Sequence, residues 1–279
     1  MTLSAAPKRV EIPMFPDGKR FAFTTSWDDG TLHDRRVVAF FNEHGIKGTF
    51  NLNSAFLDGY HGHSDSSHIS ASEVATLFAG HEVAIHTATH PWLSRLDAAQ
   101  IAEEVQRDRI ALEELVGYPV RGMAYPFGNY NPQVIAILRA LGVVYSRTCE
   151  NQNNPWPAPE PLAWRSTGHM FKPDITAEFL KWYENKGGSG LLYIWGHSYE
   201  FDRGNNWPAL ERIFKPLAGL ADVWYVTNID LYDYEAARQR LVLAANRRSA
   251  FNPSAVSVWL SVDGKSVEVP AGKTIALGA

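Results

Sequence analysis

Short apolar runs alternate with amphipathic stretches along most of this chain. Runs of this length, rich in β-branched and aromatic residues and bounded by turn residues, are typical of buried strands. We therefore predict seven strands. They occupy residues 21–27, 48–53, 82–86, 120–125, 143–148, 191–195 and 222–228.

The stretches between the strands carry the usual markers of helices. Three of them end at a glycine, which suits the left-handed end of a helix. These three are residues 34–44, 97–116 and 132–141. Asn131 followed by Pro132 predicts a helix start. Ser70 with Glu73 predicts a capping box before residues 74–78.

The alternation of strands and helices predicts parallel strands joined by crossover helices, in an open sheet or in a barrel. The polar residues that could carry chemistry all follow strand ends. In a closed barrel the carboxyl ends of all strands converge on one face, whereas an open sheet would spread these residues more widely, so we favour the barrel. After about residue 241 the pattern changes to short strands with an Asp263-Gly264 turn, which predicts a hairpin. We expect a barrel over residues 1–240 and a small β appendage over 241–279.

Composition narrows the class of protein. Hydrophobic residues make up 45% and charged residues 20% of the 279 residues, which is ordinary for a globular protein. No apolar run is long enough to span a membrane. The net charge of -4 comes without a basic stripe, so nucleic acid is not an expected partner. The composition does not indicate an oligomeric state.

The cysteine count and the N-terminus bear on the compartment. Cys149 is the single cysteine, so no internal disulfide can form. Residues 1–18 lack the apolar stretch of a secretory signal, so the default expectation is a cytoplasmic protein. A secreted or periplasmic location stays open, because a trimmed chain that begins with an added Met would look the same.

Three clusters of polar residues at strand ends are candidates for chemistry. Asp28 and Asp29 are adjacent where a strand enters a glycine turn, so one carboxylate can hold a metal while the other faces a substrate. His86 and His90 are four residues apart, and Pro91 disfavours a helix at His90, so we predict a curled loop there. His197 follows an apolar strand and could act as a proton donor near neutral pH.

Two histidines and one carboxylate suit a catalytic divalent ion, because three protein ligands leave positions open for water and substrate. Zinc is the first expectation. Cobalt, nickel, manganese and iron remain alternatives, because the same ligands also suit an octahedral ion.

Four segments in sequence order resemble the motifs of the polysaccharide deacetylases, the NodB-like carbohydrate esterases of family four. They are Asp28-Asp29-Gly30, His86-Thr-Ala-Thr-His90, Tyr125-Pro126-Phe127-Gly128 and residues 192–197. The resemblance spans about residues 20–235. It implies an α/β fold, an irregular seven-stranded (β/α) barrel of the NodB-homology type, to which the C-terminal β appendage would be added.

The resemblance also implies a role for each site residue. Asp29, His86 and His90 would bind the metal. Asp28 would be the general base and His197 the general acid. The backbone N–H of Phe127 would stabilise the oxyanion, and Tyr125 of the same motif would lie at the substrate.

This chain departs from the family pattern at one position. Many members carry an arginine where this sequence has Ala124, and that arginine orients the catalytic aspartate. A second subgroup takes its arginine from a later segment that Leu162-Ala163-Trp164-Arg165 resembles. We therefore expect Arg165 to be the partner of Asp28.

The aromatic residues suggest how a substrate is held. Trp92 lies beside His90 and Trp195 lies just before His197, so we expect both indoles near the substrate. His61, His63 and His68 are expected in a solvated loop and not in a second metal site.

The sequence therefore predicts a metal-dependent hydrolase that removes acetyl groups, as an N-acetyl amide or an O-acetyl ester, from a carbohydrate. One alternative is the hydrolysis of a small cyclic amide or imide on the same barrel, which would require a closed cavity instead of an open groove. The other is a catalytically silent carbohydrate-binding protein.

Overall fold

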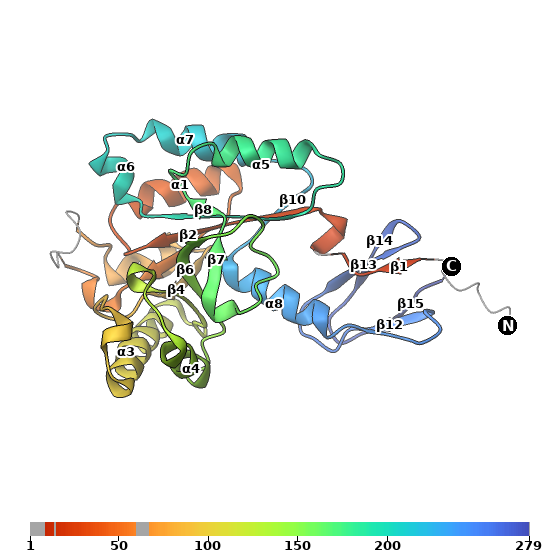
Figure 1. Ribbon diagram of the computed structural model, residues 1–279, viewed down its shortest axis with the longest axis horizontal. Helices are drawn as coiled ribbons and strands as arrows, with labels where there is room; N and C mark the ends of the chain where they lie inside the picture. Colours follow the sequence, from red (N-terminus) through yellow and green to blue (C-terminus); the bar gives the residue numbers. More distant parts are fainter. Residues whose placement is uncertain (1–8, 14, 60–66, 279) are drawn as a thin grey trace.

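A parallel β-barrel forms the centre of the molecule (Figure 1). The computed structural model describes residues 9–13, 15–59 and 67–278. Its main sheet runs in the order β7-β6-β5-β4-β3-β2-β9-β8, and all of these pairs are parallel. The strands are β2 (Phe21–Asp28), β3 (Thr49–Leu52), β4 (Glu82–Ile85), β5 (Gly122–Ala124), β6 (Tyr145–Asn151), β7 (Trp164–Ser166), β8 (Gly168–His169) and β9 (Gly190–Gly196).

The two edges of this sheet are joined by one short stretch of chain. β7 pairs with β6, and β8 pairs with β9, although only Thr167 separates β7 from β8. The Thr167 N–H also donates to the carbonyl oxygen of Tyr193 in β9, at 2.8 Å. The sheet therefore closes, and within the described residues β7 and β8 together fill the seventh strand position. The predicted irregular seven-stranded barrel is confirmed.

One predicted strand has a different place. Residues 222–228 were expected as a barrel strand, but only β10 (Val223–Tyr225) forms there. It pairs with the first half of β2 and lies outside the ring of strands that closes the barrel. The strand that closes the barrel was missed because its two pieces are short and polar, so they show no apolar run.

Helices cover the barrel, with α1, α5 and α7 on one side and α3 and α4 on the other (Figure 1). They are α1 (Asp34–His44), α2 (Val74–Leu77), α3 (Ala98–Val116), α4 (Pro132–Ala140), α5 (Ile175–Glu184), α6 (Tyr199–Arg203), α7 (Pro208–Phe214) and α8 (Asn228–Gln239). Short 3-10 helices span Pro16–Gly18, Ser54–Phe56, Ala71–Glu73, Leu93–Arg95, Pro126–Gly128, Pro161–Ala163 and Lys215–Leu217.

The predicted helix ends are confirmed. Gly117 ends α3 with φ 75°, in the left-handed region. Asp97 caps α3 by accepting from the Gln100 N–H, and Asn131 caps α4 in the same way. The capping box that begins at Ser70 is also present. Among the described residues, no helix has the length and apolar character needed to cross a membrane.

The two faces of β2 explain how the barrel presents its chemistry. Phe21, Phe23 and Trp27 belong to the main apolar core beneath the helices. The alternate residues point into the barrel, where Thr24 donates to Asn228 Oδ1 at 2.8 Å. Asp28 continues this inward series and therefore reaches the barrel mouth.

Two small antiparallel sheets lie at one end of the molecule, beside the barrel (Figure 1). The predicted hairpin is confirmed, with Asp263 and Gly264 at φ 51° and 83° in its turn. An N-terminal strand also joins it, which the sequence pattern did not indicate. One sheet is formed by β1 (Val10–Glu11), β13 (Val258–Val262) and β14 (Lys265–Val269), the other by β11 (Val242–Leu243), β12 (Ser249–Phe251) and β15 (Thr274–Ala276). The division of the chain at residue 240 stays a prediction.

Candidate active site

β2 delivers both candidate carboxylates to the barrel mouth. Asp28 is its last residue, and Asp29 begins the turn that follows. Asp29 and Gly30 have φ values of 79° and 65°, so the chain turns sharply just after the strand. The two neighbouring carboxylates consequently face different partners.

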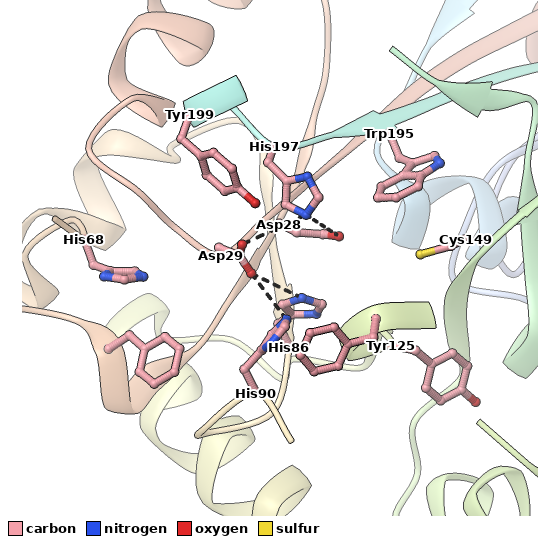
Figure 2. A pocket seen from close by; sticks show the side chains of 12 residues that line it. Asp28, Asp29, His68, His86, His90, Tyr125, Cys149, Trp195, His197 and Tyr199 are labelled. Atoms are coloured by element: carbon pink, nitrogen blue, oxygen red, sulfur yellow. Dashed lines mark ion pairs between the residues drawn. The ribbon is translucent and has the colours of Figure 1, made fainter. Parts of the chain in front are cut away.

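Asp29, His86 and His90 converge on one point (Figure 2). The Nε2 atoms of His86 and His90 each lie 3.5 Å from Asp29 Oδ1. Ligand atoms about 2.0–2.2 Å from a tetrahedral zinc ion lie roughly 3.3–3.6 Å apart, so this spacing fits a single ion. His86 Nδ1 lies 2.8 Å from the Ala124 carbonyl oxygen. Because a carbonyl only accepts, Nδ1 carries the proton, and Nε2 offers its lone pair to the ion.

The loop that carries both histidines is curled, as Pro91 predicted. Thr87 has φ 65° and His90 has φ 58°, which are sparsely populated conformations for side chains other than glycine. Burial, together with the neighbouring His86, lowers the pKa of His90 to about 4. The neutral imidazole, which is the form that binds a metal, is therefore favoured.

Hydrogen bonds from α3 and from Asn53, the residue after β3, hold this strained loop. The carboxylate of Glu104 accepts from the Thr89 N–H at 2.9 Å and from the Thr89 hydroxyl at 2.7 Å. Asp108, one turn further along α3, accepts from the His86 N–H at 2.9 Å. Asn53 donates to the carbonyl oxygen of His86 at 2.6 Å. The metal loop is therefore fixed by side chains far from it in sequence.

A buried arginine holds Asp28. Arg147, on β6, donates to Asp28 Oδ2 and, at 3.1 Å, to Ser26 Oγ. Asn51 donates to Asp28 Oδ1 at 2.8 Å. Burial raises the pKa of Asp28, but the charges of Arg147 and of the nearby histidines outweigh it and hold that pKa well below its usual range. Asp28 is therefore a carboxylate of fixed orientation.

The expectation that Arg165 is the partner of Asp28 is wrong. In β7 the residues on either side of Arg165 are buried and Arg165 faces outward, where its Nε lies 2.7 Å from Glu150 Oε2. The true partner, Arg147, pairs in register with Ala124, the position where the family pattern led us to look for an arginine. The guanidinium therefore comes from the neighbouring strand.

His197 faces the same two carboxylates from the other side of the cavity (Figure 2). Its Nε2 lies 4.0 Å from Oδ2 of Asp28 and 4.0 Å from Oδ2 of Asp29. Its Nδ1 lies 3.3 Å from Glu200 Oε1. Burial lowers the pKa of His197, but the hydrogen bond to Glu200 and the surrounding carboxylates raise it to about 9.

Aromatic side chains wall a cavity of about 390 Å³ around these groups. Tyr125, Phe127 and Trp195 line it, and the Tyr125 hydroxyl already donates to the Leu162 carbonyl oxygen at 2.7 Å. Trp92 stacks on Phe127 at 4.5 Å between centroids, with 9° between the ring planes. Trp92 is 40% exposed and Phe127 49% exposed, so the pair forms an open aromatic surface beside the cavity.

The turn that carries Phe127 is tight. Phe127 has φ 56° inside the short helix Pro126–Gly128. Gly128 has φ 64°, and a Cβ there would lie 2.8 Å from the Cys149 side chain, so only glycine fits without a shift. Backbone N–H groups in a first helical turn lack intrahelical acceptors, which suits the expected oxyanion donor at Phe127.

Sequence reasoning missed several residues of this site besides Arg147. Phe56, His68 and Tyr199 line the cavity, and Glu200 contacts His197. Tyr199 and Glu200 follow His197 closely in sequence, which was a usable signal. No local signal places His68 there, because its loop was expected in solvent. His61 and His63 lie outside the described residues.

The fold and the cluster define a (β/α) barrel of the deacetylase type with a candidate divalent-metal site. The family model described as polysaccharide deacetylase matches residues 16–146, the segment that carries the aspartate pair, both histidines and Phe127. Over this segment the chain is similar to the polysaccharide deacetylase family.

Comparison with individual proteins gives remote relatives. The chain is 27% identical over 176 residues to the uncharacterized protein YlxY of Bacillus subtilis (strain 168), which covers 60% of this chain and 52% of YlxY. It therefore spans about half the length of this curated relative. A Mycobacterium smegmatis protein assigned as a polysaccharide deacetylase has a similar fold, with TM-score 0.58, 19% identity and coverage of 85% of this chain and 96% of that one.

The solved structures similar to this chain also include a pseudoenzyme. It is a family 4 carbohydrate esterase pseudoenzyme from Bacillus anthracis, with TM-score 0.47 and 15% identity, which covers 78% of this chain and 66% of that one.

Proposed function

We propose that this protein removes acetyl groups from a carbohydrate, as N-acetyl amides or O-acetyl esters, with one divalent ion held by Asp29, His86 and His90. Zn²⁺ is the ion we propose first, since two imidazoles and one carboxylate at this spacing suit it, with Co²⁺, Ni²⁺, Mn²⁺ and Fe²⁺ as alternatives. When bound, such an ion polarises an acyl oxygen and acidifies water.

The observation that carries the proposal is the placement of a fixed base and a protonated histidine around this cluster. Asp28 is ionised and held by Arg147, so it is ready to accept a proton from water that attacks the acyl carbon. His197 presents Nε2 toward the same space and can donate a proton to the departing nitrogen or oxygen. The Phe127 N–H would share the charge of the oxyanion.

The aromatic surface beside the cavity supports a carbohydrate over a small cyclic amide. A small ring would be favoured by a closed cavity, whereas Trp92 and Phe127 are stacked and exposed at the rim. Flat aromatic faces can stack on the apolar face of a sugar ring, and this aromatic pair lies next to His90, whose ring centroid is 4.5 Å from that of Phe127.

Acetate release tests this proposal. The protein is depleted of metal, reloaded with Zn²⁺ and assayed on acetylated xylan, chitooligosaccharides and peptidoglycan fragments. We expect release that needs the metal and that falls by at least about 100-fold in Asp28→Asn, because the general base is lost. A catalytically silent binder would retain a substrate of this panel without releasing acetate, and that result would overturn the proposal.

A further inference from the structure

A second histidine, His169, contacts the glutamate that supports the candidate acid His197. Glu200, on α6, lies between two imidazoles: His197 Nδ1 is 3.3 Å from its Oε1, and His169 Nε2 is 2.8 Å from its Oε2. His169 is the last residue of β8 and pairs in register with Trp195 of β9. One carboxylate is therefore shared by a histidine at the cavity and a histidine fixed to the barrel.

The protonation of His169 follows from its other contact. Its Nδ1 lies 3.3 Å from the Phe171 N–H, which can only donate. Nδ1 is therefore the acceptor, and the proton of a neutral ring sits on Nε2, facing Glu200. Burial raises the pKa of Glu200, but the two histidines lower it to about 2, so Glu200 is an ionised carboxylate in contact with both rings.

His169 is the more rigid of the two partners. Its ring packs edge-on against Trp195 at 4.9 Å, and Trp195 in turn lies under the guanidinium of Arg147 at 4.4 Å. Glu200 belongs to a five-residue helix, where a long side chain has several rotamers open to it. The contact with His169, which is part of the barrel, restricts the Glu200 side chain to the rotamer that contacts His197.

We propose that His169 is a positioning residue that acts on His197 through Glu200. This inference rests on the proposed function, because it assigns the support of the proposed acid. His169 and Glu200 together hold a carboxylate oxygen at His197 Nδ1, so His197 Nε2 stays directed into the cavity. The carboxylate also stabilises the charged imidazolium that must donate its proton to the leaving group.

The same three side chains could instead hold a second cation, since their ligand atoms lie within 4.8 Å of one another. The distance of 2.8 Å between His169 Nε2 and Glu200 Oε2 favours a direct contact. Tetrahedral ligands of one ion with bonds of about 2.0–2.1 Å lie farther apart, at roughly 3.3 Å.

The test compares two leaving groups. In His169→Ala we expect kcat for acetylated glycan to fall about 10- to 100-fold with KM unchanged, because the acid is misplaced. Hydrolysis of 4-nitrophenyl acetate, whose leaving group needs no proton, should change less than about twofold. His169→Gln, which keeps an N–H at the place of Nε2, should recover most of the loss. Lys172→Ala, in the same loop, is the matched control and should behave as wild type.

Equal losses on both substrates, or no loss on glycan, would overturn the inference while leaving the proposed function intact. A wild type that releases no acetate from any substrate would instead defeat the proposed function. A crystal structure of His169→Ala decides the inference in that case: Glu200 should turn away from His197, and a carboxylate that stays in place contradicts us. Two zinc ions per wild-type chain and one per His169→Ala chain would show a second metal site and also overturn it.

Discussion

At the scale of single residues, the pairing of Asp28 with Arg147 is the contact that most clearly distinguishes this site. A fully buried guanidinium and a buried carboxylate neutralise each other at the barrel mouth, and His197 Nε2 lies farther from the same carboxylate, at 4.0 Å. Removing one member of such a pair leaves an uncompensated charge in a medium of low dielectric.

Arg147→Ala should therefore lower the free energy of unfolding by about 3–5 kcal/mol, and acetate release should fall with it. Arg165→Ala, a substitution at the half-exposed ion pair with Glu150, should change stability by less than about 0.5 kcal/mol and leave activity unchanged. Urea denaturation measures the stability of both variants, and the acetate assay measures their activity. A larger effect at Arg165 than at Arg147 would contradict the assignment.

Sequence reasoning found the candidate metal ligands but not this arginine, and the reason is physical. Asp29, His86 and His90 follow strand ends, where the pattern of apolar runs places them on one face. Arg147 lies inside a predicted strand, and no local pattern tells which way a strand residue points when both of its faces are buried. Only the register of β6 against β5 brings its guanidinium to Asp28.

At the scale of elements, helix α3 supports the metal loop. Glu104 and Asp108 lie four residues apart on one face of α3, and both accept hydrogen bonds from the loop that carries His86 and His90. The sequence predicted the helix and its end at Gly117, because both are local signals. It could not predict these contacts, which need the packing of α3 on β4.

Glu104→Ala should weaken metal binding by about 10- to 100-fold, the usual cost of removing an outer-shell contact. The loop would lose both hydrogen bonds at Thr89, so the strained positions at Thr87 and His90 would relax away from the ion. Titration of metal-free protein with Zn²⁺ measures the affinity. The neighbouring exposed residue provides the control, and Glu103→Ala should bind as wild type. Equal affinities for both variants would show that α3 does not support the site.

At the scale of the whole molecule, the barrel interior is a polar network that extends from the mouth toward its other end. Glu82 lies fully buried at the start of β4, where its Oε1 accepts from the Tyr145 hydroxyl and its Oε2 from Thr49 and the Ile229 N–H. Burial raises the pKa of Glu82 to about 7, against the lowering effect of these hydrogen bonds. Folding therefore favours protonated Glu82.

This network makes stability depend on pH. The folded pKa of Glu82, about 7, is higher than the ordinary glutamate value of 4.5, so the folded state holds the proton more tightly. Its contribution is complete below about pH 4.5 and is lost as the pH rises through 7, a change on the order of 3 kcal/mol. Glu82→Gln imitates the protonated form, so wild type should lose stability relative to this variant over that range. Denaturation at a series of pH values measures the difference, and a constant difference would contradict the assignment.

The seven-stranded barrel was predictable as a whole, because seven strand positions and their crossover helices leave few closed arrangements. The way the barrel closes was not predictable. The stretch from Trp164 to His169 joins both edges of the sheet through two strands that are too short and polar to show a strand pattern. Nor could the pairing of β1 with β13, which joins residues near opposite ends of the chain, be predicted.

The central claim is that one ion sits between Asp29, His86 and His90, and anomalous scattering from a zinc-soaked crystal tests it most directly. We predict one strong peak within about 2.0–2.3 Å of Asp29 Oδ1 and of both Nε2 atoms, and no peak in His90→Ala. A peak elsewhere in the molecule, or imidazoles that point apart around empty space, would contradict the account.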